Sequence, residues 1–113
     1  MSMVNDEKLK ELTELSGGNN LLLIDLLEKF VVNAAKYIEK AKSGINNKNK
    51  EDVQFAIHTL KGSSMSLGLS KLGELLTRMN ADIKNGIYEN CMAEILLVEQ
   101  MVAEVDKYRK TIT

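Results

Sequence analysis

The sequence contains no proline and no tryptophan, and aromatic residues make up only 4% of its 113 positions. Without proline, the commonest interruption of a helix is missing. Hydrophobic residues still account for 44% of the chain, so its core has to be built from Leu, Ile, Val, Met and Ala. These residues, together with abundant Glu and Lys, favour helix. The composition therefore predicts an all-α fold.

Cysteine and histidine each occur only once, as Cys91 and His58. A lone cysteine cannot form an internal disulfide. One cysteine and one histidine cannot supply the four ligands of the usual structural zinc site, so we expect no metal. Cys91 borders a stripe of apolar residues, and we interpret it as a small buried hydrophobe rather than a reactive thiol.

Neither sign of charge is in excess, since 15 basic and 16 acidic residues give a net charge of -1. A nucleic-acid-binding domain usually carries a basic excess, so that class is not expected. No segment approaches the ~20 apolar residues that span a membrane, and the first residues lack the apolar core of a signal peptide. We expect a cytoplasmic protein in which residues 1–113 form a single domain.

Apolar residues recur at spacings of three and four, which is the pattern of amphipathic helices. It predicts five helical segments: a short one at about Asp6–Leu15, then Leu21–Lys42, Glu51–Leu67, a segment that begins after Ser70 and ends at Asn85–Gly86, and Glu89–Lys110. We expect Gly44 to cap the end of the second segment and Ser70 to cap the start of the fourth. Four long helices joined by short polar loops predict an antiparallel up-down four-helix bundle, with the short N-terminal helix covering one end.

The third segment carries the only histidine of the chain. Successive residues of a helix are about 100° apart, and this rule places the following residues on one core-facing side: Val53, Ile57, Leu60, Ser64 and Leu67. His58 lies roughly 150° from the centre of that side and should point into solvent. The outward patch predicted around it consists of Gln54, His58, Lys61, Gly62 and Met65. Phe55 lies at its boundary, and exposed apolar groups beside His58 suit a docking surface.

Lys61 and Gly62, which follow His58 by three and four residues, indicate what this exposed histidine could do. A glycine inside a helix costs about 1 kcal/mol relative to alanine, but beside His58 it lets another molecule's backbone or phosphate come close. Lys61, one turn from the imidazole, would neutralise phosphate oxygens carried by His58. Unprotonated imidazole is nucleophilic near neutral pH. Together these residues indicate phosphoryl exchange with a protein partner.

The machinery of an independent enzyme is missing from the sequence. There is no Gly-rich phosphate loop of the P-loop type. The nearest acids in sequence, Glu51 and Asp52, lie too far from His58 along or around the helix to orient it as a catalytic base. The chain should therefore be a phosphocarrier rather than an enzyme, with no cofactor of its own. The partner would supply the magnesium ion and most of the transition-state stabilisation.

The segment His58-Thr59-Leu60-Lys61-Gly62-Ser63-Ser64, followed by Leu67-Gly68-Leu69, resembles the histidine-phosphotransfer (HPt) domains of two-component phosphorelays. The resemblance implies that His58 accepts a phosphoryl group from the aspartate of a receiver domain and passes it to another receiver. Lys61 would then lie near the phosphoryl group, and Gly62 would leave room for the receiver. A polar side chain from the following helix approaches the histidine in this family, and Asn80 is the match here. The implied partners are response-regulator receiver domains or a hybrid sensor kinase, and the isolated chain would be a monomer.

Other classes of protein share parts of this pattern. A related branch at the front of chemotaxis kinases shares the His-Lys-Gly pattern, but Thr59-Leu60 and Ser63-Ser64 look more like the phosphorelay branch. A four-helix adaptor that docks receiver domains without being phosphorylated would keep the same motif, and this alternative stays open. A heme- or metal-binding bundle would need a second strong ligand near His58, and the sequence provides none.

Overall fold

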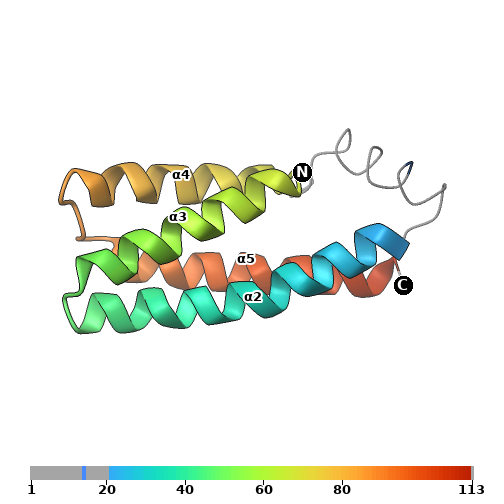
Figure 1. Cartoon of the computed structure of the whole chain (residues 1–113), viewed down its shortest axis with the longest axis horizontal. Coiled ribbons are helices and arrows are strands. Elements are labelled where there is room, and N and C mark those ends of the chain that lie inside the picture. Colours follow the sequence, from blue (N-terminus) through green and yellow to red (C-terminus); the bar gives the residue numbers. More distant parts are fainter. Residues whose placement is uncertain (1–13, 15–20, 113) are drawn as a thin grey trace.

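The computed structural model describes Glu14 and residues 21–112. These residues form four helices and no strand: α2 (Leu21–Asn46), α3 (Lys50–Ser66), α4 (Ser70–Lys84) and α5 (Cys91–Thr111). Figure 1 shows them as long rods joined by short connections. The short helix expected at about Asp6–Leu15 lies outside the described residues, apart from Glu14.

The four helices form an up-down bundle in which successive helices run antiparallel (Figure 1). Helix α2 packs against α3 and α5, and α4 packs against the same two helices, so α2 and α4 lie diagonally across the bundle, as do α3 and α5. The sequence-based prediction of an antiparallel four-helix bundle is therefore confirmed. None of the described helices has the length and hydropathy of a membrane-spanning segment.

The core is aliphatic, as the composition predicts. Each helix contributes side chains that are fully inaccessible to solvent, among them Leu27, Ile57, Leu76 and Ile95. Burying a side chain of this size stabilises the fold by about 1.5–3 kcal/mol. Phe30 is the one aromatic residue among the buried side chains of the described chain. Cys91 is 3% exposed and belongs to the same cluster, which confirms its interpretation as a small core residue.

Helix α2 is longer than the sequence pattern predicts, because Gly44 does not end it. The helix continues to Asn46, and Gly44 is buried in its last turn. A Cβ atom on Gly44 would lie 2.8 Å from Cγ2 of Val53 and 3.1 Å from the backbone oxygen of Asn49. The predicted cap at Gly44 was wrong, because the missing side chain serves instead to let the start of α3 approach α2 closely. The N-cap of α3 is Asn49, whose side chain accepts a hydrogen bond from the backbone N–H of Asp52.

The start of α4 also differs from the prediction. Ser70 is the first residue of the helix, the N-cap is Leu69, and no side chain caps the helix by a hydrogen bond. Leu69 is fully buried, and it follows Gly68, whose φ of 69° places it in the left-handed region. The helix is therefore anchored by a buried leucine after a glycine turn, and the predicted Ser70 cap was wrong. Helix α5 begins at Cys91, slightly later than the predicted Glu89.

Candidate functional site

Helix α3 holds His58 on its outer side. The side chain of His58 is exposed, whereas the residue before it, Ile57, is fully buried. The buried side of α3 consists of Val53, Ala56, Ile57, Leu60 and Ser64. The outward position that helical spacing predicts for His58 is therefore confirmed. Since neighbouring residues of a helix point in different directions, the burial of Ile57 fixes the orientation of His58.

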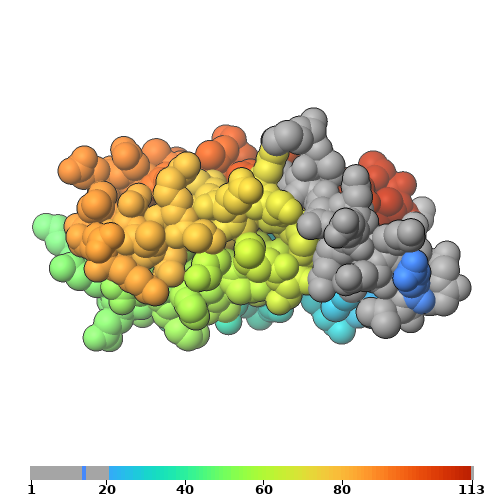
Figure 2. Space-filling view, turned by 90° about the horizontal axis from the view of Figure 1, so that it is seen from above, coloured from blue at the N-terminus to red at the C-terminus, as the bar shows by residue number. Residues whose placement is uncertain are grey.

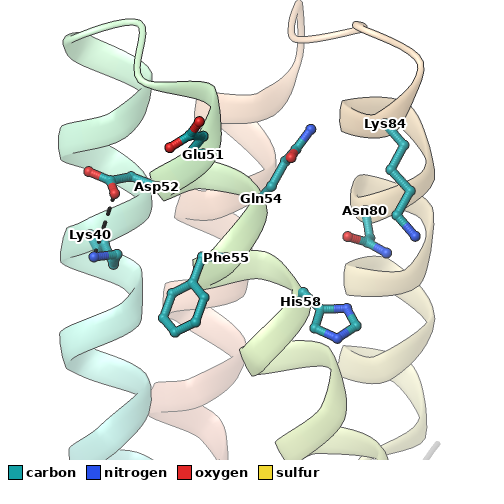
Figure 3. A pocket seen from close by; sticks show the side chains of 8 residues that line it. All are labelled: Lys40, Glu51, Asp52, Gln54, Phe55, His58, Asn80 and Lys84. Atoms are coloured by element: carbon teal, nitrogen blue, oxygen red, sulfur yellow. Dashed lines mark ion pairs between the residues drawn. The ribbon is translucent and has the colours of Figure 1, made fainter.

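An open hollow with a volume of about 700 Å³ lies beside His58, and we call it the His58 hollow. Three helices contribute to its lining: Lys40 from α2, then Glu51, Asp52, Gln54, Phe55 and His58 from α3, and Asn80 and Lys84 from α4. Figure 2 shows α3 and α4 side by side on one face of the molecule. In Figure 3 the imidazole of His58 lies on the side of α3 that borders α4, close to Asn80. His58 is thus exposed, and it lies at a concave surface that α3 forms together with α4.

Asn80 reaches this hollow from a buried position. It is 5% exposed and is one of two buried polar residues in the described chain. None of the side-chain hydrogen bonds among the described residues involves Asn80. The structure thus places Asn80 beside His58 in the lining of the same hollow.

Lys61 and Gly62 lie on the turn that follows His58. Lys61 is partly buried and does not line the hollow, so the structure places it beside the site rather than inside it. Gly62 is exposed, and a Cβ atom added to it would meet no other atom within 4 Å. Packing among the described residues therefore does not require this glycine, which agrees with a clearance for another molecule.

Phe55 forms an ordered apolar surface on the α2 side of His58. Phe55 is 55% exposed, and its ring lies 6.1 Å from the ring of Tyr37, centroid to centroid, at a tilt of 57°. The ammonium of Lys40 lies 5.5 Å from the centre of the same ring and pairs with Asp52 at 3.6 Å. These contacts hold Phe55 in place although it faces solvent.

Met65 and Gln54 complete the predicted outward patch. Met65 is 58% exposed, and its sulfur crosses to α4, where a Cβ on Gly73 would lie only 2.6 Å from it. Gln54 is exposed and lines the hollow one turn before His58. Apolar groups therefore flank His58 toward both ends of α3, with Phe55 before it and Met65 after it.

Lys84 is a residue of the hollow that the sequence analysis missed. It lies on the next helix, far from His58 in sequence, and only the packing of α4 against α3 brings it to the site. Its spacing of four residues from Asn80 places both on one face of α4, which is the signal that could have revealed it. Among residues 21–112, no group of three or more His, Cys, Asp or Glu side chains is arranged to hold a metal ion.

The fold and the site together define a helical bundle domain that presents one histidine on an open face. The profile of the Hpt domain family matches residues 25–108, which is most of the chain. This chain therefore belongs to the Hpt domain family, the histidine-phosphotransfer domains of phosphorelays, which work with receiver domains. The resemblance carried by the motif around His58 is confirmed.

A solved structure of the same kind supports the fold. The crystal structure of histidine-containing phosphotransfer protein B (HptB) from Pseudomonas aeruginosa PAO1 is similar to this chain with a TM-score of 0.86. The match covers 96% of this chain and 92% of that chain at 19% sequence identity. At this identity the likeness shows a shared architecture. No curated protein sequence shows a significant match to this chain.

Proposed function

We propose that this domain is a phosphorelay carrier, in which His58 accepts a phosphoryl group from the aspartate of one receiver domain and passes it to another. The observation that carries the proposal is the position of His58, exposed on α3 at an open hollow, in a chain of the Hpt family. A receiver aspartate belongs to a second protein, so the accepting ring has to be reachable from outside. An exposed position meets this requirement, whereas a buried histidine would not.

The transfer exchanges one bond to phosphorus for another. The lone pair of an unprotonated ring nitrogen of His58 attacks the phosphorus of the phospho-aspartate. An N–P bond forms while the P–O bond of the acyl phosphate breaks, and the aspartate leaves as a carboxylate. In the return step, a carboxylate oxygen of the next receiver attacks the phosphorus. A new P–O bond forms while the N–P bond breaks, and the free imidazole leaves. No nucleotide is consumed, which fits a chain whose sequence contains no P-loop.

The residues around His58 support this exchange without performing it alone. Lys61, one turn away, supplies positive charge for the phosphoryl oxygens. Gly62 leaves open space on the same turn, so the receiver backbone can approach. The magnesium ion that such phosphoryl transfer requires is proposed to sit on the receiver. The chain is thus a carrier, and the partner provides most of the catalysis.

The receiver is proposed to dock over the surface that surrounds His58. Phe55 and Met65 offer exposed apolar area on either side of the histidine, and Gln54 and Asn80 offer polar groups between α3 and α4. Apolar surface of this kind rimmed by polar residues is typical of interaction sites. The same surface would serve the donor and the acceptor in turn, because both must reach the same ring.

The test is a His58→Gln variant exposed to phosphorylated receiver domains of the source organism. Glutamine keeps a polar side chain of moderate size at an exposed position, so the fold and the docking surface should persist. We expect the wild type to take up acid-labile phosphate and the variant to take up none, while both bind receivers equally in calorimetry. Labelling of the variant would show that His58 is not the acceptor. A wild type that binds receivers but is never labelled would instead identify an adaptor that docks them without phosphorylation.

A further inference from the structure

Two lysines line the His58 hollow, and their surroundings differ. Lys40 is engaged within the chain, since it pairs with Asp52 at 3.6 Å and lies over the ring of Phe55. Lys84 is exposed, and none of the ion pairs between residues 21 and 112 involves it. Arg78, another cation of α4, pairs with Glu94 of α5 at 3.5 Å. The hollow therefore contains one lysine whose charge is not compensated by a described carboxylate.

The direction of the Lys84 side chain leads toward His58. Side chains of an α-helix lean toward its N-terminus, so a residue covers the surface of the preceding turn. The preceding turn of α4 carries Asn80 on the same face, and Asn80 lines the hollow together with His58. Figure 3 shows the Lys84 side chain running back along α4 toward Asn80, on the side where the His58 ring lies. A flexible four-carbon stem can carry the ammonium over the remaining gap.

The position of Lys84 in the last turn of α4 has an alternative explanation. A cation near the C-terminus of a helix is stabilised by the helix dipole, and Lys84 is the basic residue of that turn. This role concerns the stability of the helix and requires no ligand. It does not explain why the side chain lines the hollow beside an exposed histidine, and it predicts a different experimental response.

We propose that Lys84 is a second phosphate-binding cation, which contacts the phosphoryl group on His58 from α4 while Lys61 acts from α3. Asn80, one turn before it, would donate an amide hydrogen bond to the same group. A phosphoryl group carries about 1.5 to 2 negative charges at neutral pH, and charge-assisted contacts to it are stronger than neutral ones. Lys84 therefore stabilises phospho-His58 relative to the free histidine. This inference rests on the proposed phosphorylation of His58.

The first experiment loads His58 chemically, so that no receiver is needed. Wild type, Lys84→Gln and the control Lys107→Gln are treated with phosphoramidate, and the phosphoryl group is titrated by ³¹P NMR. Lys107 is an exposed lysine of α5 and does not line the hollow. Because exposed ion pairs are weak, we expect about a threefold higher proton affinity of the phosphoryl group in Lys84→Gln than in wild type. The control should match wild type, and 0.5 M salt should reduce the difference because it screens exposed charges.

The second experiment measures the equilibrium of phosphoryl groups between a receiver and each of the three proteins. Lys84→Gln should shift it about threefold toward the receiver, and Lys107→Gln should leave it unchanged. Equal titrations and equal equilibria in all three proteins would overturn the role of Lys84 and leave only its effect on the helix. Equal shifts in both variants would overturn it as well, because they would reflect net charge alone. If no receiver exchanges with the wild type, the proposed carrier function fails, while the ³¹P titration still decides the role of Lys84.

Discussion

Replacing Gly62 by alanine should make the domain more stable and the phosphoryl transfer slower. Gly62 lies within α3, has no positive φ, and a Cβ atom added to it would meet nothing within 4 Å. The substitution therefore gains helix propensity without any packing cost in the isolated chain. This gain is about 0.5–1 kcal/mol, which corresponds to an increase in melting temperature of about 4 °C for a domain of this size.

Transfer should respond in the opposite direction if the space at Gly62 serves a partner. The added methyl group would project into the region that an approaching receiver occupies beside His58. Since small displacements of reacting groups lower rates steeply, we expect transfer from a phosphorylated receiver to slow by about tenfold or more. The assay combines urea unfolding followed by circular dichroism with the initial rate of acid-labile labelling. Phosphorylation by phosphoramidate, which is small, should proceed at the wild-type rate.

Gly44→Ala is the matched control, because the same substitution there meets other atoms. Its Cβ would lie 2.8 Å from a methyl group of Val53 and 3.1 Å from the Asn49 backbone oxygen. Overpacking of this kind costs about 1–3 kcal/mol, which exceeds the propensity gain, so stability should fall. A loss of stability in Gly62→Ala would refute the open position of Gly62. A gain of stability with transfer at the wild-type rate would refute the idea that Gly62 provides clearance for a receiver.

Two further predictions concern ionisable groups. Cys91 is the first residue of α5, where a helix N-terminus favours the thiolate, but burial and the charge of Glu94 raise its pKa to about 11. Only about one Cys91 thiol in three thousand is then ionised at pH 7.5. Ellman's reagent should therefore react with Cys91 no faster than the chain unfolds. A rapid stoichiometric reaction would contradict the burial of Cys91. Hydrogen bonding from Arg109, aided by Lys110, lowers the pKa of Asp106 below its ordinary value of 3.8. The ion pair therefore stabilises the fold at pH values above the unfolded pKa of 3.8, and this effect is lost as the pH falls through the lower pKa of the folded state. We expect Asp106→Asn to lower the free energy of unfolding at pH 7, as measured by urea unfolding, and to have no effect toward pH 2.

Helical periodicity alone predicts much of this molecule, because a helix fixes the direction of every side chain relative to its neighbours. Once Ile57 is assigned to the core, the exposure of His58 and Gln54 follows from an angle of about 100° per residue. The same reasoning predicts the bundle, since four amphipathic stripes have to be buried against one another. The site residues that lie on α3 could therefore be predicted from the sequence.

Features that are decided by packing against another element could not be predicted from helical periodicity. Lys84 joins the site only through the packing of α4 against α3, and its charge matters because no described carboxylate compensates it. Ser70 has the composition of an N-cap, but the burial of Leu69 decides where α4 starts. In both cases a contact between elements decides the outcome. Spacing within one helix shows which residues share a face, but it does not show what that face meets.

The glycines show most clearly why a residue type does not determine a role. Gly44, Gly62 and Gly73 all lie inside helices, where glycine is unfavourable, so each position calls for an explanation. Gly44 admits the start of α3, Gly73 accommodates the sulfur of Met65, and Gly62 faces open space. Two of the three are thus explained by packing within the chain, and the third is not. A helical glycine with no packing partner among the described residues points to a surface that is completed by another molecule, and here that surface adjoins the histidine.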